Sequence, residues 1–249
     1  MKNIIKNIIK NIIKNIIIIP ARLQATRFPN KPLANICGVP MIMHVYNQAV
    51  KSGVGDVWVA GGDEEIIQCV ERLGGKAVLT DSALPSGTDR IYQALTKIGE
   101  SVDTVINVQG DIPTVEPMVI KTVADALAHG ADITTACACI KDTDEINNPN
   151  VVKAYADFST SSIATATAFT REAIGEAPFY HHIGLYGYTA SSLTKFVSLS
   201  PSENEIKHSL EQLRAMDAGM RIDICKVDDV PVGVDTPEDL EKAIAYLNR

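Results

Sequence analysis

The chain has 249 residues, of which 46% are hydrophobic, and a formal net charge of -7. This length allows one large α/β domain with a full core, and the acidic balance argues against a nucleic-acid-binding surface, which usually carries a basic patch. The five cysteines include no C-x-x-C pair, so they indicate neither a disulfide framework nor a structural zinc site and are typical of a cytoplasmic protein.

The chain begins with the tetrapeptide KNII, which is repeated four times between Lys2 and Ile17. A lysine at every fourth residue keeps the apolar runs too short for a signal peptide or a membrane span. We interpret residues 1–15 as a low-complexity extension without a catalytic role. The alternative interpretation is a short amphipathic helix that anchors the protein at a membrane surface.

Residues 16–249 are predicted to form a single α/β domain, because short apolar runs alternate with longer helix-like segments. This pattern favours a mostly parallel central sheet with helices on both faces. The expected strands are 16–19, 56–60, 77–79, 104–108, 131–140, 151–157, 181–189 and 222–227. The expected helices are 41–51, 64–73, 88–98, 117–129, 190–197, 203–218 and 237–247. Alternating polarity after residue 133 indicates a smaller antiparallel lobe, approximately 133–220.

The loop after the first strand carries three fixed positive charges, Arg22, Arg27 and Lys31, among prolines that stiffen it. Ligands of open α/β sheets bind at the carboxyl ends of strands, and Arg and Lys form charge-assisted hydrogen bonds to phosphate. The loop has no glycine and no Walker spacing, so side chains must do much of the binding. It predicts a polyphosphate site, and the alternative is a solvated basic turn.

Two aspartates follow expected strands and precede turns. Asp111 ends Gln109-Gly110-Asp111 after the apolar strand 104–108, and Asp235 stands just before the last helix. Mg²⁺ takes one or two carboxylates together with substrate phosphates, and paired carboxylates are costly to ionise without a cation. We expect the fold to bring them together at a metal site. The alternatives are a plain turn aspartate at 111 and a helix cap at 235.

Three further segments place polar groups where a ligand could approach. The turn Ser86–Arg90 offers amides and hydroxyls for a base or a phosphate, or is an ordinary helix cap. On the strand 181–189, His182, Gly184, Tyr186 and Tyr188 share one face, although a histidine in a sheet is more often structural. In the helix 203–218, Glu211, Gln212 and Arg214 either recognise a polar substrate or form a solvated face.

Together these segments resemble the 3-deoxy-manno-octulosonate cytidylyltransferases (CMP-Kdo synthetases). PARLQATRFPNKPL, SGTDR, NVQGD, NPNVVK, HHIGLYGY, LEQLR and VDTPEDL occur in the family's order, from about residue 16 to the carboxyl terminus. The resemblance implies a nucleotide-diphospho-sugar transferase type of fold with a smaller sugar-binding and dimerisation lobe. It also implies transfer of CMP from CTP to Kdo with release of diphosphate, for lipopolysaccharide biosynthesis, by a Mg²⁺-dependent homodimer.

Residue roles follow from the matched motifs. Arg22, Lys31, Asp111 and Asp235 are implied to be catalytic, and both aspartates to bind Mg²⁺. The implied nucleotide-binding residues are Ala21, Arg22, Arg27, Lys31, Ser86, Thr88, Asp89, Arg90 and Gln109. The implied sugar-binding residues are His182, Tyr186, Glu211, Gln212 and Arg171.

Two positions depart from the family pattern. Ile112 replaces a glutamate beside the metal-site aspartate. The family's sugar-binding arginine falls near Thr167 by counting from Lys153, whereas the nearest arginine is Arg171. Either Arg171 substitutes through a shifted loop, or the sugar affinity is lowered or altered. The alternative functions are therefore a cytidylyltransferase for 8-amino-Kdo or a sialic-acid-like sugar, and a catalytically silent nucleotide-binding paralogue.

Overall fold

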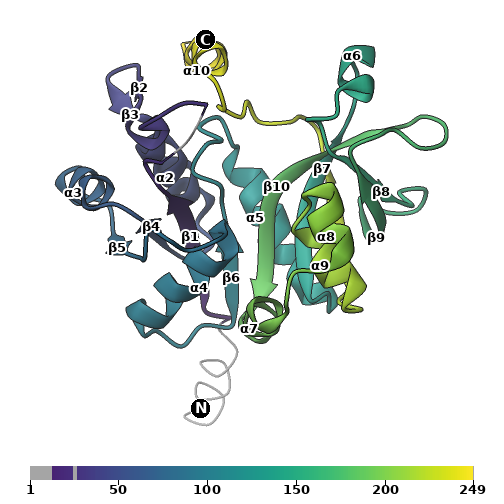
Figure 1. Cartoon of the computed structure of the whole chain (residues 1–249), viewed down its shortest axis with the longest axis horizontal. Helices are drawn as coiled ribbons and strands as arrows, with labels where there is room; N and C mark the ends of the chain where they lie inside the picture. The colour runs from purple at the N-terminus through teal and green to yellow at the C-terminus, as the bar shows by residue number, and fades with distance from the viewer. Residues whose placement is uncertain (1–12, 25–26, 249) are drawn as a thin grey trace, which may run out of the picture.

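A computed structural model describes residues 13–24 and 27–248 (Figure 1). Residues 1–12 lie outside the described residues, and with them most of the segment 1–15 that we interpret as an extension; its last residue, Asn15, is the first residue of β1. The strands are β1 (Asn15–Ala21), β2 (Asn35–Ile36), β3 (Val39–Pro40), β4 (Asp56–Gly61), β5 (Ala77–Leu79), β6 (Thr104–Asn107), β7 (Ile133–Cys139), β8 (Lys153–Ala156), β9 (Ile163–Thr170), β10 (Tyr180–Thr189) and β11 (Ile222–Val227).

The helices cover both faces of the sheet. They are α2 (Met41–Ser52), α3 (Glu64–Arg72), α4 (Gly87–Ile98), α5 (Pro117–Ala126), α6 (Thr143–Asn147), α7 (Ala190–Ser198), α8 (Glu203–His208), α9 (Gln212–Asp217) and α10 (Pro237–Leu247), with 3-10 turns η1 (Lys31–Leu33) and η2 (Leu127–His129). No helix in the described ranges is long and apolar enough to cross a membrane.

Nine of the described strands form one mixed sheet in the order β5-β4-β1-β6-β10-β7-β11-β9-β8. β5, β4, β1 and β6 are parallel, whereas β10 is antiparallel to both β6 and β7. The α/β fold is thus confirmed. The sheet is more mixed than the expected mostly parallel one, because β10 is antiparallel to both of its neighbours and β9 is antiparallel to β11 and β8, whereas β7 and β11 are parallel.

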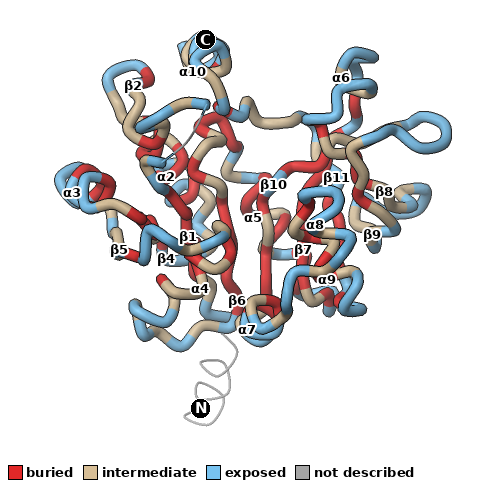
Figure 2. Tube along the Cα trace, viewed as in Figure 1, coloured by how far each residue is buried: buried red, intermediate tan, exposed pale blue. Residues whose placement is uncertain are grey.

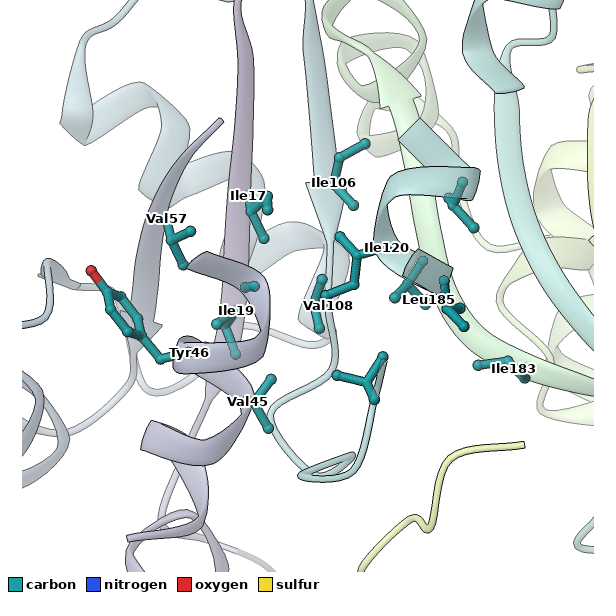
Figure 3. Packing of buried hydrophobic residues seen from close by; sticks show 14 of the residues in the cluster. Ile17, Ile19, Val45, Tyr46, Val57, Ile106, Val108, Ile120, Ile183 and Leu185 are labelled. Carbon is teal, nitrogen blue, oxygen red and sulfur yellow. The ribbon is translucent and has the colours of Figure 1, made fainter. Parts of the chain in front are cut away.

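The apolar run of β1 lies at the centre and supplies both layers of the core. Ile17 and Ile19 pack with residues of α2, α3 and α5 on one face, and Ile16 and Ile18 with residues of α4 and α7 on the other. Figure 3 shows the first layer, with Ile106 beside Ile17. In Figure 2 the central strands are red and the outlying α6 and α10 are largely pale blue. The buried strands thus form a rigid base for the loops at their ends.

Most expected elements are confirmed within one or two residues, but the expected helix 203–218 differs, and β9 and the short β2, β3 and α6 were not predicted. The expected helix 203–218 is two helices, because Ser209 adopts a left-handed φ of 52° between α8 and α9. β9 was not predicted, although Ile163–Thr170 alternates in polarity. β9 pairs with both β8 and β11, so tertiary pairing stabilises a segment of weak apolar character.

The carboxyl-terminal segment returns from β11 across the top of the molecule to α10, in yellow in Figure 1. The Val234 amide donates to the Asp111 carbonyl (2.8 Å), and the Val232 amide to Thr114 Oγ1 (2.7 Å). Val234 packs with Ile36 in a small apolar cluster. These contacts fix the end of this segment beside the loop that follows β6.

Candidate active site

A cleft of about 370 Å³ lies at the carboxyl ends of β1 and β6. The basic loop, the turn before α4, the loop after β6 and the segment before α10 all contribute to it. Its lining residues are Pro20, Ala21, Arg22, Gln24, Arg27, Lys31, Pro32, Leu84, Pro85, Ser86, Gly87, Arg90, Gln109, Gly110, Asp111 and Asp235. The cleft therefore brings together side chains from both ends of the sequence.

The basic loop is held by backbone hydrogen bonds at both ends. The Leu23 amide donates a hydrogen bond to the side-chain oxygen Asp63 Oδ2 (2.7 Å). The Asn30 amide donates one to the Leu23 carbonyl (3.1 Å). Asn30 has a left-handed φ of 59°, which Asn tolerates better than most residues, and it leads into η1. This closure turns Lys31 inward, with 14% of its side chain exposed.

Lys31 joins the two aspartates that the sequence places at a metal site. Its Nζ lies 2.9 Å from Asp111 Oδ2 and 3.1 Å from Asp235 Oδ1, and Arg27 lies 3.1 Å from Asp235 Oδ2. Burial lowers the pKa of Lys31, but the two carboxylates outweigh this effect and raise the net pKa above its ordinary value. The expected meeting of Asp111 and Asp235 is thus present in the structure.

Asp235 is available to the cleft because its neighbour caps the helix. The Thr236 side chain accepts a hydrogen bond from the Asp239 amide, and the Asp239 side chain accepts one from the Thr236 amide, which together form a capping box. The alternative interpretation of Asp235 as the cap of α10 is therefore wrong.

The floor of the cleft depends on a glycine. A Cβ on Gly110 would lie 2.9 Å from the Pro20 carbonyl oxygen, so only glycine lets this loop approach the end of β1 so closely. Next to it, Gln109 Cγ lies 4.0 Å from the position of a Cβ on Gly184. Tyr186–Thr189 of β10 pair with β6 in the antiparallel direction, so the preceding residues of β10 lie next to the loop that follows β6.

Some residues of the turn before α4 line the cleft, and others do not. Ser86, Gly87 and Arg90 line the cleft, whereas Thr88 and Asp89 are absent from the described lining. Arg90 is 2% exposed and donates to Thr80 Oγ1 (2.6 Å), so its guanidinium supports the loop that precedes α4. Burial and, next, the charge of Arg22 lower the pKa of Arg90.

Thr88, by contrast, faces the implied sugar-binding residues. Its Oγ1 donates to Glu211 Oε2 at 2.7 Å. Nearby, Tyr186 Oη donates to Gln212 Oε1 at 3.4 Å, and the His182 ring lies 5.6 Å from the Tyr186 ring. The structure thus brings together four of the five implied sugar-binding residues, from β10 and the start of α9.

Two buried polar atoms in this group, Glu211 Oε1 and Gln212 Nε2, have no hydrogen-bond partner among the described residues. Buried groups of this kind are costly to leave unpaired. Burial also raises the pKa of Glu211, with Thr88 and Ser86 opposing the shift. The two free atoms suit a ligand that carries hydroxyl groups.

The fifth residue, Arg171, has a different set of contacts. Its guanidinium donates to the carbonyls of His208 (2.9 Å), Pro149 (3.1 Å) and Ser209 (3.0 Å). The buried Lys153 donates to the Arg171 carbonyl (2.9 Å). Arg171 therefore holds the turn that leads into Glu211. Thr167 lies within β9 and donates to the Tyr155 carbonyl.

His182 is buried and pairs with Thr135 Oγ1 at 3.0 Å. Burial, helped by His181, lowers its pKa from 6.5 to about 3. As the pH falls below 6.5, the unfolded chain binds a proton that the folded chain excludes, so stability is lost. We expect this residue to make unfolding about 1.4 kcal/mol easier at pH 5.5 than at pH 7.5. Urea denaturation at both pH values should show a smaller difference for His182→Gln; an equal difference in the two proteins would contradict the assignment.

The sequence did not reveal several lining residues. Gln24, Leu84 and Pro85 lie in loops whose path only the fold defines. Gly110 could have been found, because a glycine directly after a buried strand often marks a close backbone approach. Lys153 belongs to the NPNVVK motif, but its burial required the structure.

Comparison with known proteins identifies the family to which the chain belongs. The profile of the cytidylyltransferase family matches residues 16–222. The 3-deoxy-manno-octulosonate cytidylyltransferase of Parvibaculum lavamentivorans is 53% identical over 94% of this chain and 92% of its own, and that of Methylobacterium radiotolerans is 50% identical over 93% and 96%.

Solved structures agree with the sequence relatives. A CMP:2-keto-3-deoxy-manno-octonic acid synthetase complexed with CTP has a TM-score of 0.87 and 36% identity, covering 94% of this chain and 98% of its own. A nucleotidyl transferase from Methanothermobacter, at 14% identity and a TM-score of 0.63 over 95% of this chain and 98% of its own, shows the same fold. The chain therefore belongs to the 3-deoxy-manno-octulosonate cytidylyltransferase family.

Proposed function

We propose that this enzyme transfers CMP from CTP to Kdo and releases diphosphate. The observation that carries the proposal is the cluster in which Lys31 contacts Asp111 and Asp235 within a cleft that also holds Arg22 and Arg27. Such a site suits a triphosphate and a divalent cation. Relatives with about 50% identity over most of the chain carry the name of this activity.

The nucleotide lies in the cleft, with its triphosphate on the basic loop. Arg22, Arg27 and Lys31 supply positive charge on the side of the departing diphosphate. Ala21, Ser86 and Gln109 line the part nearest the ends of β1 and β6, where the base and ribose fit.

The carboxylates of Asp111 and Asp235 fit Mg²⁺. A single ammonium reaches one oxygen of each, at 2.9 and 3.1 Å, so one cation can contact both residues. Substrate phosphates and water would complete the octahedral set that Mg²⁺ prefers. When bound, the ion would neutralise charge on the phosphate oxygens.

The acceptor binds beside the nucleotide, against His182, Tyr186, Glu211 and Gln212. Glu211 Oε1 and Gln212 Nε2 have no hydrogen-bond partner among the described residues. In the complex, Glu211 Oε1 would accept a hydrogen bond from one sugar hydroxyl, and Gln212 Nε2 would donate one to another. Arg171 orders the turn before Glu211, and a sugar carboxylate would compete with the backbone carbonyls for its guanidinium.

The reaction is an in-line displacement. The anomeric hydroxyl oxygen of Kdo forms a bond to the α-phosphorus, the bond from the α-phosphorus to the diphosphate oxygen breaks, and the hydroxyl proton passes to solvent. The cationic loop stabilises the charge that develops on the diphosphate. No protein nucleophile is required.

We also propose that residues 16–249 form one cytidylyltransferase domain that works as a cytoplasmic homodimer, with the region around 133–220 at the interface. Ile174 lies three residues after Arg171, and Ile206 lies three residues before Ser209, in the turn that Arg171 binds. Their exposed fractions are 61% and 69%. A second copy that covers them would remove their apolar surface from water. Light scattering during gel filtration should give twice the chain mass, and a monomer would refute the dimer.

The activity is tested by incubating the full chain with CTP, Mg²⁺ and Kdo and measuring diphosphate and CMP-Kdo. We expect equal amounts of both products, and none without the metal. Parallel reactions with 8-amino-Kdo and a sialic acid test the related acceptors. CTP binding in calorimetry without any product would instead indicate a silent paralogue.

A further inference from the structure

Thr88 connects the nucleotide cleft to the acceptor pocket. It lies in the first turn of α4, directly after Ser86 and Gly87, which line the cleft. Its side chain is turned away from the cleft, is 1% exposed and donates to Glu211 Oε2 at 2.7 Å. The two residues are 123 positions apart in the sequence.

The hydrogen bond from Thr88 fixes one oxygen of the Glu211 carboxylate. Its other oxygen, Oε1, is buried without a hydrogen-bond partner among the residues described. Arg214 Nη2 lies 4.0 Å from Oε1, too far for a hydrogen bond. Thr88 therefore holds one carboxylate oxygen and leaves the other free.

The turn that carries Thr88 is itself tied to the cleft. Ser86 caps α4 by accepting from the Asp89 amide (3.1 Å) and donates to Asp89 Oδ2 (2.8 Å). A nucleotide that packs against Ser86 and Gly87 thus restricts the same turn that orients Glu211.

We propose that Thr88 is a positioning residue that couples nucleotide binding to acceptor binding through Glu211. This inference rests on the proposed function, since it takes CTP and a sugar acid as the two ligands. A bound nucleotide fixes the first turn of α4, which holds Glu211 in the direction that binds the acceptor. By linkage, the acceptor tightens nucleotide binding by the same factor.

The test compares Thr88→Val, which keeps the shape and removes the hydroxyl, with Thr88→Ser, which keeps the hydroxyl. Thr134→Val is the matched control, because Thr134 is fully buried and donates to the Val123 carbonyl (2.8 Å) outside the described cleft lining. For each protein we would measure kcat, the KM for Kdo, and CTP affinity by calorimetry. Kdo binding is measured with and without a CTP analogue that has a methylene bridge between the α- and β-phosphates.

For Thr88→Val we expect the KM for Kdo to rise about 10- to 100-fold, as for loss of a hydrogen bond to a charged group. CTP affinity without Kdo should change less than about threefold, and the analogue should no longer tighten Kdo binding. Thr88→Ser should restore both properties, and Thr134→Val should resemble the wild type. If Thr88→Val does not fold, Thr88→Ala takes its place in the same comparison.

Three results would overturn the inference: an unchanged KM for Kdo in Thr88→Val, an equal loss of CTP affinity, or no rescue by serine. An equal loss of CTP affinity would assign Thr88 to the nucleotide site. A lack of rescue by serine would assign Thr88 a role in packing alone. If the wild type forms no CMP-Kdo, the proposed function fails. If the wild type is active and Thr88→Val keeps its coupling, only this inference fails.

Discussion

Asp111→Asn is expected to lower kcat for CMP-Kdo formation by about 10³-fold or more, while the fold survives. Asparagine keeps the shape and the backbone carbonyl that accepts from Val234, but removes the charge that would hold Mg²⁺. The Asp111 side chain is 36% exposed and the Asp235 side chain 51%. Water can therefore replace the missing carboxylate ligand less easily at position 111.

Steady-state kinetics over a range of Mg²⁺ concentrations would measure the effect, and Mn²⁺ binding to the CTP complex would follow the metal separately. Asp229→Asn is the control, because Asp229 is 80% exposed and pairs only at the surface with Lys141. Full activity of Asp111→Asn, or unchanged Mn²⁺ binding with CTP, would remove Asp111 from the metal site.

Lys31→Met is expected to lower kcat/KM for CTP by about 10²- to 10³-fold. The variant removes a largely buried positive charge from the triphosphate side of the cleft, where electrostatic interactions are strong. It also leaves Asp111 and Asp235 without the cation that they share. Lys31→Arg should recover part of the activity, since it restores the charge in a bulkier form.

The measurement is CTP-dependent diphosphate release, with CTP binding by calorimetry. Lys141→Met is the matched control, since its side chain is 73% exposed and pairs with the exposed Asp229. An undiminished kcat/KM in Lys31→Met would mean that Arg22 and Arg27 alone bind the triphosphate.

Much of the fold was predictable because local patterns and tertiary contacts agree. The run Ile16–Ile19 is buried on both faces, as an almost wholly apolar strand requires. β5, β11 and α10 begin and end at the predicted residues. β9 was missed, because alternating alanine and threonine gives a weak strand signal and its stability comes from β8 and β11.

The helix expected over 203–218 shows where local pattern fails. Ser209 interrupts it in a left-handed conformation, and Arg171 binds the carbonyls of His208 and Ser209. A hydrogen bond from a residue 38 positions away leaves no trace in the helical periodicity. The interruption also sets where α9 begins, so that Glu211, the residue before α9, lies within hydrogen-bond distance of Thr88.

The residue types and motifs along the chain were enough to identify the family, and they predict a basic, proline-stiffened loop for phosphate and two carboxylates after strands for a cation. Residue type and short-range spacing carry that information, because charge and backbone stiffness are local properties. Which of these groups lie in contact depends on the fold. It placed Lys31 between Asp111 and Asp235, turned Thr88 toward Glu211 and buried Arg90 as a support. These pairings join residues far apart in the chain, and strand order and burial, not local sequence, bring them together.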